Sequence, residues 1–223
     1  MNKYPIHNRP YYAEYLLKNF PDKKIILFLH NEFLSKNNHS NNSKKVFLLK
    51  NCSSIIFVSK YLKDSFFQNL EIKDRNNAHI IYNTISKAKK FNFKKKKNII
   101  FAGKLNKSKG FDIFGKSILK ILDKYPNWNA HIIGNEKREN YNFVHKNLIF
   151  KDWISHKKLI NLYDKSSISV VNPTWNEPFG RTALESSSRG CAVITSKSGG
   201  LNETFSNNFF LKENNSYNLT LEL

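Results

Sequence analysis

Residues 170–185 constrain the fold of this chain more than any other part of the sequence. An apolar run at residues 168–171 ends in a turn that contains Pro173, and a helix-compatible stretch follows. We expect Pro178 in the first turn of that helix, because the N–H that proline lacks would have no partner inside the helix. Gly180 lets the backbone approach a ligand closely, and free amides at a helix start attract phosphate. The segment therefore predicts a strand–turn–helix unit that can hold an anionic ligand.

Two glutamates, Glu177 and Glu185, stand eight positions apart in this segment. At the α-helical rise of about 1.5 Å per residue they would lie roughly 12 Å apart. That separation matches the span from sugar to ribose in a nucleotide sugar. The alternative is an ordinary strand–turn–helix unit with surface glutamates.

Apolar runs of strand length alternate with helix-type segments along the whole chain, which is typical of parallel α/β sheets. The strands are expected at residues 23–29, 53–60, 78–85, 98–103, 130–133, 148–154, 168–171, 192–195 and 209–211. The clearest helix is expected at residues 111–125, where apolar residues form one stripe before Pro126. At the start of another expected helix, Ser59 fits an N-cap better than a ligand-binding residue. The pattern predicts an α/β protein with two Rossmann-like parallel-sheet units.

A basic stretch at residues 87–97 separates the two sets of strands and is interpreted as solvated linker. The expected organisation is a partial N-terminal Rossmann-like unit at residues 1–90, a basic linker at residues 91–97, and a second Rossmann-like unit at residues 98–223. The first unit contains only about three expected strands. The end of the chain is expected to be a polar tail.

The formal net charge of +20, from 37 Lys and Arg against 17 Asp and Glu, raises the question of an anionic partner. Nucleic acid, an anionic membrane surface and anionic glycan intermediates all fit that charge. The lysines are scattered and not grouped with aromatic stacking motifs, so compositional drift explains most of the charge and no nucleic-acid partner is expected. Peripheral contact with an anionic membrane or a lipid-linked acceptor stays open.

The sequence contains no apolar run long enough for a transmembrane helix and no signal-peptide pattern, so a cytoplasmic location, with possible peripheral contact at the inner face of the membrane, is expected. Cys52 and Cys191 fit no metal-ligand spacing and flank apolar strands. They are expected to be buried reduced thiols.

Residues 177–185, Glu-Pro-Phe-Gly-Arg-Thr-Ala-Leu-Glu, resemble the E-x7-E signature of the retaining GT-B glycosyltransferases of the GT4, or "glycosyl transferases group 1", family. Residues 189–204 are also similar to that family, with a strand and a glycine-rich turn before an acidic residue. The resemblance implies a GT-B fold whose N-terminal unit is incomplete. It also implies transfer of a hexose from a nucleotide sugar, with retention, to a cell-surface glycan or lipopolysaccharide-type acceptor.

A second match covers residues 98–110, where a strand, Gly-Lys, a loop and Lys-Gly precede a helix, as in the family's diphosphate grip. Retaining GT-B enzymes use no divalent metal, so fixed cations must neutralise the departing nucleoside diphosphate. Lys104 and Lys109 are the candidates, each a point charge without the bidentate fork of arginine. No metal and no cofactor besides the donor substrate are expected.

The resemblance implies roles for further residues on both sides of the site. Glu177 would orient sugar hydroxyls, Glu185 would accept hydrogen bonds from the ribose, and His30 would line the sugar. The catalytic candidates are Lys104, Lys109, Glu177 and His30. The donor-binding candidates are Gly103, Phe179, Gly180, Arg181, Thr182, Glu185, Trp153 and Ile154.

Two positions depart from the family pattern: Thr84 and Asp152 stand where the family has glycine. The first departure weakens a ligand role for Asn83. The second weakens base contacts from the backbone of Trp153 and Ile154, and leaves open that Trp153 belongs to the core.

A complete enzyme of this family is nearly twice as long, so truncation at the N-terminus, and possibly at the C-terminus, is expected. The main alternative function is a nucleotide-sugar-binding remnant that performs no transfer. A nucleotide-sugar epimerase and a basic nucleic-acid module are two further candidate functions. An epimerase would need acid and base side chains around the sugar, which the sequence does not show, and steep salt-dependent DNA binding would favour the nucleic-acid module.

Overall fold

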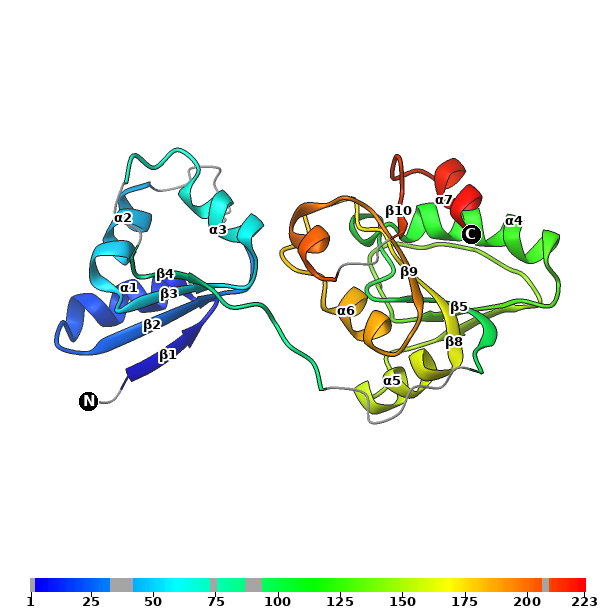
Figure 1. Ribbon diagram of the computed structural model, residues 1–223, viewed down its shortest axis with the longest axis horizontal. Helices are drawn as coiled ribbons and strands as arrows, with labels where there is room; N and C mark the ends of the chain where they lie inside the picture. Colours follow the sequence, from blue (N-terminus) through cyan, green and yellow to red (C-terminus); the bar gives the residue numbers. More distant parts are fainter. Residues whose placement is uncertain (1–2, 33–41, 73–75, 87–93, 206–208) are drawn as a thin grey trace. The chain divides into compact units, whose positions relative to one another are not determined.

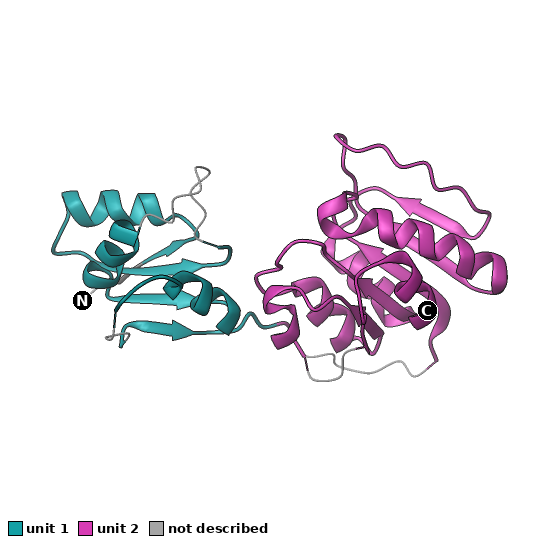
Figure 2. Cartoon of the chain, turned by 90° about the horizontal axis from the view of Figure 1, so that it is seen from above, with its two compact units in different colours: residues 1–84 teal, residues 85–223 magenta. Residues whose placement is uncertain are grey.

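The computed structural model describes residues 3–32, 42–72, 76–86, 94–205 and 209–223. The chain forms two compact units, Met1–Thr84 and Ile85–Leu223 (Figures 1 and 2). We call them the first unit and the second unit and describe each by itself. The predicted fold class, α/β with two parallel-sheet units, is confirmed.

The first unit contains a four-stranded parallel sheet in the order β1-β2-β3-β4. Its strands are β1 (Lys3–His7), β2 (Lys24–Leu29), β3 (Ser54–Phe57) and β4 (Ala78–Ile80), and its helices are α1 (Pro10–Asn19), α2 (Asn42–Asn51) and α3 (Lys60–Phe67). The expectation of about three strands was wrong because β1, Lys-Tyr-Pro-Ile-His, has no continuous apolar run. Pairing with β2 makes it a strand, and Pro5 is tolerated because β1 is at the edge of the described sheet.

Helix α1 buries only two residues. Ala13 and Leu17 are buried, whereas Tyr12, Tyr15 and Phe20, which share the apolar spacing of this segment, are about half exposed. At the next strand end, the Ser59 Oγ accepts a hydrogen bond of 3.0 Å from the Leu62 N–H, which confirms the predicted N-cap.

The second unit contains a six-stranded sheet in the order β10-β9-β8-β5-β6-β7, with every pairing parallel. Its strands are β5 (Lys96–Ala102), β6 (Asn129–Ile133), β7 (Leu148–Lys151), β8 (Ser166–Val171), β9 (Ala192–Thr195) and β10 (Phe209–Phe210). Its helices are α4 (Phe111–Lys124), α5 (His156–Lys165), α6 (Arg181–Ser188) and α7 (Ser216–Glu222), with the 3-10 turns η1 (Lys107–Lys109) and η2 (Gly199–Glu203). Because β5 begins at Lys96, two lysines assigned to the linker belong to the sheet; residues 91–93 lie outside the described residues.

The end of the chain is not a polar tail. Helix α7 begins after Asn215, whose side chain caps it, and buries Leu219 against α4 (Figure 1). The sequence hid this helix because only one of its residues, Leu219, is buried, so no apolar stripe marks it.

The two faces of the second sheet carry separate cores because successive strand residues point to opposite sides. Ile99 and Phe101 of β5 pack with α4, including its buried Phe114. Ile100 points to the other face and packs with Tyr163 of α5 and Ala183 of α6. Helices therefore cover both faces, as a parallel sheet requires.

The order of strands reverses beside β5. From β5 the chain adds β6 and β7 on one side of that strand, then returns to place β8, β9 and β10 on the other. Ligands of open parallel sheets bind at the carboxyl ends of the strands that flank such a reversal. We therefore expect a ligand site at the loops after β5 and β8.

Both cysteines are buried and free, as predicted. Burial raises the pKa of the Cys52 thiol to about 12 and that of Cys191 to about 11, so both remain protonated at neutral pH. Among the described residues, no helix combines the length and the apolar composition needed to cross a membrane.

We expect Phe114→Ala to lower the free energy of unfolding by about 3–5 kcal/mol, because it removes a fully buried ring and leaves a cavity in the core under α4. Lys116→Ala, on the exposed side of the same helix, should change it by less than about 0.5 kcal/mol. Urea unfolding followed by circular dichroism measures both. Equal effects would contradict the assignment of this helix face to the core.

Candidate functional site

A small cleft opens at the carboxyl ends of β5 and β8, where the strand order reverses. Its lining comes from the end of β5, the 3-10 turn after it, the end of β8 and the start of α6. The lining residues are Phe101, Ala102, Gly103, Lys109, Val170, Val171, Asn172, Pro173, Glu177, Gly180 and Thr182. Five residues that the sequence singled out, Gly103, Lys109, Glu177, Gly180 and Thr182, thus meet around one cleft.

The loop after β5 is shaped by Asn106, which caps the turn η1. Its side-chain Oδ1 accepts hydrogen bonds from the Lys109 N–H (3.0 Å) and the Ser108 hydroxyl (2.9 Å). Gly110 then turns the chain into α4 with φ 75°, in the left-handed region that favours glycine. These contacts fix the position from which the Lys109 side chain leaves the backbone.

Three hydrogen bonds join this loop to the one after β8. Thr174 donates from its N–H to the Ser108 carbonyl (3.0 Å) and from its hydroxyl to the Lys107 carbonyl (2.9 Å). The buried Asn172 side chain donates to the Gly110 carbonyl (3.2 Å). These three hydrogen bonds hold the two loops against each other.

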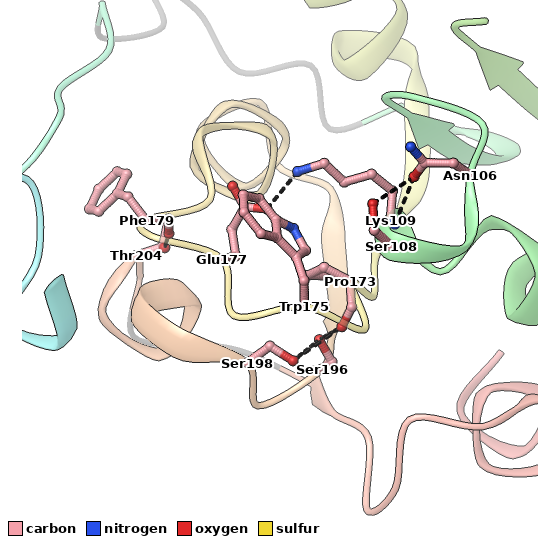
Figure 3. A network of polar contacts seen from close by, with 10 residues as sticks. All are labelled: Asn106, Ser108, Lys109, Pro173, Trp175, Glu177, Phe179, Ser196, Ser198 and Thr204. Carbon is pink, nitrogen blue, oxygen red and sulfur yellow. Dashed lines mark hydrogen bonds and ion pairs between the residues drawn. The ribbon is translucent and has the colours of Figure 1, made fainter. Parts of the chain in front are cut away.

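Lys109 and Glu177 form an ion pair in the cleft, with 2.7 Å between Nζ and Oε2. Both side chains are largely buried, with 30% of Lys109 and 19% of Glu177 exposed. The Trp175 ring lies beside them, and its indole N–H donates to the same Oε2 at 3.0 Å (Figure 3).

The backbone of Glu177 is held by the glycine-rich turn that precedes Glu203. The Gly200 N–H donates to the Glu177 carbonyl at 2.7 Å. A Cβ on Gly199 would lie 2.5 Å from that carbonyl, so only glycine allows this approach. The Ser196 and Ser198 hydroxyls donate to the Pro173 carbonyl on the same loop (Figure 3).

Helix α6 begins at Arg181, so the prediction that Pro178 lies in its first turn was wrong. Gly180 is the N-cap, with φ 93°, and the preceding Phe179 is buried, with its carbonyl accepting a hydrogen bond from Thr204. A residue other than glycine would be strained at this φ. Because this φ is not helical, the helix begins only after Gly180.

In the first turn of α6 the Ala183 N–H donates to the Gly180 carbonyl at 3.0 Å, whereas the N–H groups of Arg181 and Thr182 precede the first carbonyl that the helix can offer them. Such amides at a helix start suit an anion.

Glu185 lies deeper, on α6, and does not line the cleft. Only 6% of it is exposed; its Oε1 accepts a hydrogen bond from Arg181 at 3.2 Å and lies 3.2 Å from Nε2 of His156. A ribose would have to share this carboxylate with those two side chains.

The other predicted site residues are not brought to the cleft lining. Lys104 is exposed immediately after Gly103, and Trp153 and Ile154 lie in the loop between β7 and α5. Trp153 is 59% exposed, so the alternative that it belongs to the core was wrong. His30 belongs to the first unit, where its Nε2 lies 3.2 Å from Nδ1 of His7.

Sequence reasoning missed three residues of this site, Asn172, Thr174 and Trp175. All three follow β8 directly, and the carboxyl end of a parallel strand is the signal that could have found them. Asn172 is fully buried, and its Oδ1 has no hydrogen-bond partner among the described residues. Within the described part of the chain, no three His, Cys, Asp or Glu side chains are grouped as a metal site would require.

A parallel sheet whose order reverses beside a glycine-containing loop, a fixed lysine and a helix N-terminus is typical of a Rossmann-like nucleotide-binding unit. Residues 83–220, more than half of the chain, match the family model described as glycosyl transferases group 1. The chain therefore belongs to this family of glycosyltransferases.

A curated relative named as a glycosyltransferase agrees with this assignment. The chain is 26% identical to the putative glycosyltransferase YtcC of Bacillus subtilis over 89% of its own length and 56% of YtcC. It is 27% identical to an uncharacterized 41.2 kDa protein in the cps region of Klebsiella pneumoniae, over 59% of this chain and 40% of that protein. The chain thus spans about half the length of the curated relatives that it matches.

Among solved structures, Anabaena Alr3699/HepE in complex with UDP-glucose matches with a TM-score of 0.72 and 16% identity. The match covers 98% of this chain and 67% of that one, so it includes both parallel-sheet units. The shared fold is the GT-B type predicted from the sequence.

We expect Gly110→Ala to destabilise the second unit by about 1–3 kcal/mol more than Gly190→Ala, because of steric overlap. The two glycines have nearly equal φ, 75° and 77°, so backbone strain is matched. A Cβ at Gly110 would lie 2.0 Å from the Asn172 carbonyl oxygen, whereas at Gly190 its nearest neighbour is the Lys95 Cε at 3.5 Å, an ordinary contact distance. Urea unfolding measures the difference, and equal destabilisation would contradict the close contact between the two loops.

Proposed function

We propose that this chain carries the donor side of a retaining, metal-independent hexosyltransferase of the GT4 type. The observation that carries the proposal is the convergence of Lys109, Glu177 and the N-terminus of α6 on one cleft at the strand reversal. Cationic and amide donors placed where negative charge develops stabilise a departing nucleoside diphosphate.

In this proposal each group has a physical task. The Lys109 ammonium and the amides after Gly180 bind the diphosphate, and exposed Lys104 adds charge at the rim of the site. Glu177 orients sugar hydroxyls, and Glu185 accepts from the ribose. The diphosphate leaves from the face at which the acceptor hydroxyl attacks and takes its proton, so the anomeric configuration is retained.

Support for the substrate classes comes from the relatives. HepE is seen with UDP-glucose, which makes a uridine donor the first to test. A relative in a cps region supports an acceptor in surface polysaccharide or lipopolysaccharide assembly. We further propose that His30, Trp153 and Ile154 contact sugar and base, and that the first unit corresponds to the acceptor side and the second unit, with β5 beginning at Lys96, to the donor side.

The second candidate is a nucleotide-sugar-binding fragment that performs no transfer. The groups described in the cleft, Lys109, Glu177 and the start of α6, would hold a nucleotide sugar whether or not transfer follows, which supports this candidate equally. An assay of sugar transfer distinguishes the enzyme from the binding fragment. Release of UDP from UDP-glucose that depends on a glycan acceptor and is insensitive to EDTA, with NMR showing an unchanged anomeric configuration, supports the enzyme. Tight UDP binding with no turnover supports the fragment.

We expect Lys109→Ala to weaken the binding of UDP about 10- to 100-fold, because a hydrogen bond to a charged group contributes about 1.5–3 kcal/mol. Lys107→Ala is the matched control: it removes the same charge from the same turn, but Lys107 is exposed and does not line the cleft. Calorimetric titration with UDP and GDP measures both. Equal losses would show that only the general positive field matters, and no heat with either nucleotide would overturn the donor site.

We also propose that any contact with an anionic membrane is made by the outward face of α1. Tyr11, Tyr12 and Tyr15 of α1 and its C-cap Phe20 are each 50–58% exposed, the Lys44 ammonium lies 4.5 Å from the centre of the Tyr11 ring, and Lys18 belongs to the same helix. Aromatic rings at the headgroup level combined with lysines match an anionic lipid surface.

We expect the Tyr12→Ser, Tyr15→Ser double variant to lose several-fold in binding to vesicles of phosphatidylcholine with phosphatidylglycerol, since it removes two rings that would enter the headgroup layer. Tyr217→Ser, which changes a tyrosine of the second unit that is even more exposed, should bind as the unchanged protein does. Sedimentation with vesicles measures the effect, and vesicles of phosphatidylcholine alone test the role of charge. Unchanged binding of the double variant would exclude this face.

A further inference from the structure

Trp175 contacts both charged groups of the cleft, although no part of the donor-site prediction included it. Its indole N–H donates to Oε2 of Glu177 at 3.0 Å, and the Lys109 ammonium lies 4.7 Å from the centre of its ring. Lys109 also reaches the same Oε2 at 2.7 Å. One carboxylate oxygen therefore accepts from two donors, and one cation has two partners.

Packing does not explain this placement of Trp175. Trp175 is 38% exposed, and it follows the buried Asn172 and Pro173 on the outer part of the loop. A tryptophan that only filled the core would be buried, as Tyr163 is. The exposed ring is instead directed at the ion pair (Figure 3).

A bound diphosphate would change the contacts among Trp175, Lys109 and Glu177. A diphosphate in the cleft would compete with Glu177 for the Lys109 ammonium, since both are anionic. Once Lys109 turned to the phosphate, the carboxylate would lose its cationic partner. The indole N–H would then remain as its described side-chain donor and would keep Oε2 in place, with Oε1 directed to the sugar.

We propose that Trp175 is a positioning residue of the donor site. Its N–H holds the Glu177 carboxylate in the orientation that receives the sugar, and its ring face holds the Lys109 ammonium until an anionic ligand takes it. The proposal rests on the proposed function of this cleft and adds how the sugar-binding carboxylate stays ordered when its salt bridge opens.

The first test distinguishes the role of the indole N–H from the role of the aromatic ring. Trp175→Phe keeps an aromatic face for Lys109 but removes the donor to Glu177, so UDP, which carries no sugar, should bind within about threefold of the unchanged protein. UDP-glucose should lose about tenfold or more in affinity, the cost of one hydrogen bond to a charged group. Trp175→Ala should weaken both ligands. Equal losses of UDP and UDP-glucose in Trp175→Phe would overturn the positioning role.

The second test measures the fluorescence of Trp175 itself and does not depend on whether the Trp175→Phe variant folds. In a full-length chain with Trp128→Phe and Trp153→Phe, Trp175 is the only emitter left of the three tryptophans. Because Trp153 is itself proposed to contact the base, the UDP affinity of this chain is first measured by calorimetry, and emission is compared at saturating UDP. Binding of UDP should change its fluorescence because the ammonium leaves the ring, and the same chain with Lys109→Ala should show no such change at saturating UDP. Calorimetric binding without any change in emission would overturn the role of the ring. Absence of calorimetric binding of UDP and GDP to the unchanged chain would instead overturn the proposed function of the cleft.

Discussion

The parallel pairing of β5 with β8 is the constraint on which the site depends. These strands are joined by a long excursion through α4, β6, β7 and α5, yet Phe101 and Val170 are paired in register. Because parallel strands end at the same edge, this pairing brings the loops after Gly103 and after Val171 together. The hydrogen bonds of Thr174 and Asn172 then join the loops, and the lysine of one meets the glutamate of the other.

The chain carries 37 lysines and arginines, so positive charge alone cannot mark a site. Lys109 differs from the others by its surroundings: its backbone is capped by Asn106, its side chain is 30% exposed, and it has an acidic partner at 2.7 Å. Lys107 and Lys104 belong to the same loop but point into solvent. A fixed ammonium in a partly buried cleft interacts more strongly with a phosphate than a screened surface charge does.

The first unit shows where apolar periodicity misleads. Tyr12, Tyr15 and Phe20 have the spacing of a core stripe, but the residues that α1 buries are Ala13 and Leu17. The aromatic rings then occupy the outer face. In the second unit the stripe of α4 does face the core, since its Phe114 and Ile118 pack directly on β5 and its neighbours.

The sequence by itself determined the α/β class, the two parallel sheets, the N-cap at Ser59, the buried thiols and the family, because strand-length apolar runs, capping residues and the residues 177–185 motif are local signals. It did not determine β1 or α7, which exist only through pairing with β2 and packing on α4. It placed Pro178 in a helix that the positive φ of Gly180 delays to Arg181. Only the tertiary structure decided that Lys109, and not Lys104, meets Glu177, and that Trp175 contacts both. Those contacts depend on how loops far apart in sequence are brought together, and no local pattern encodes that.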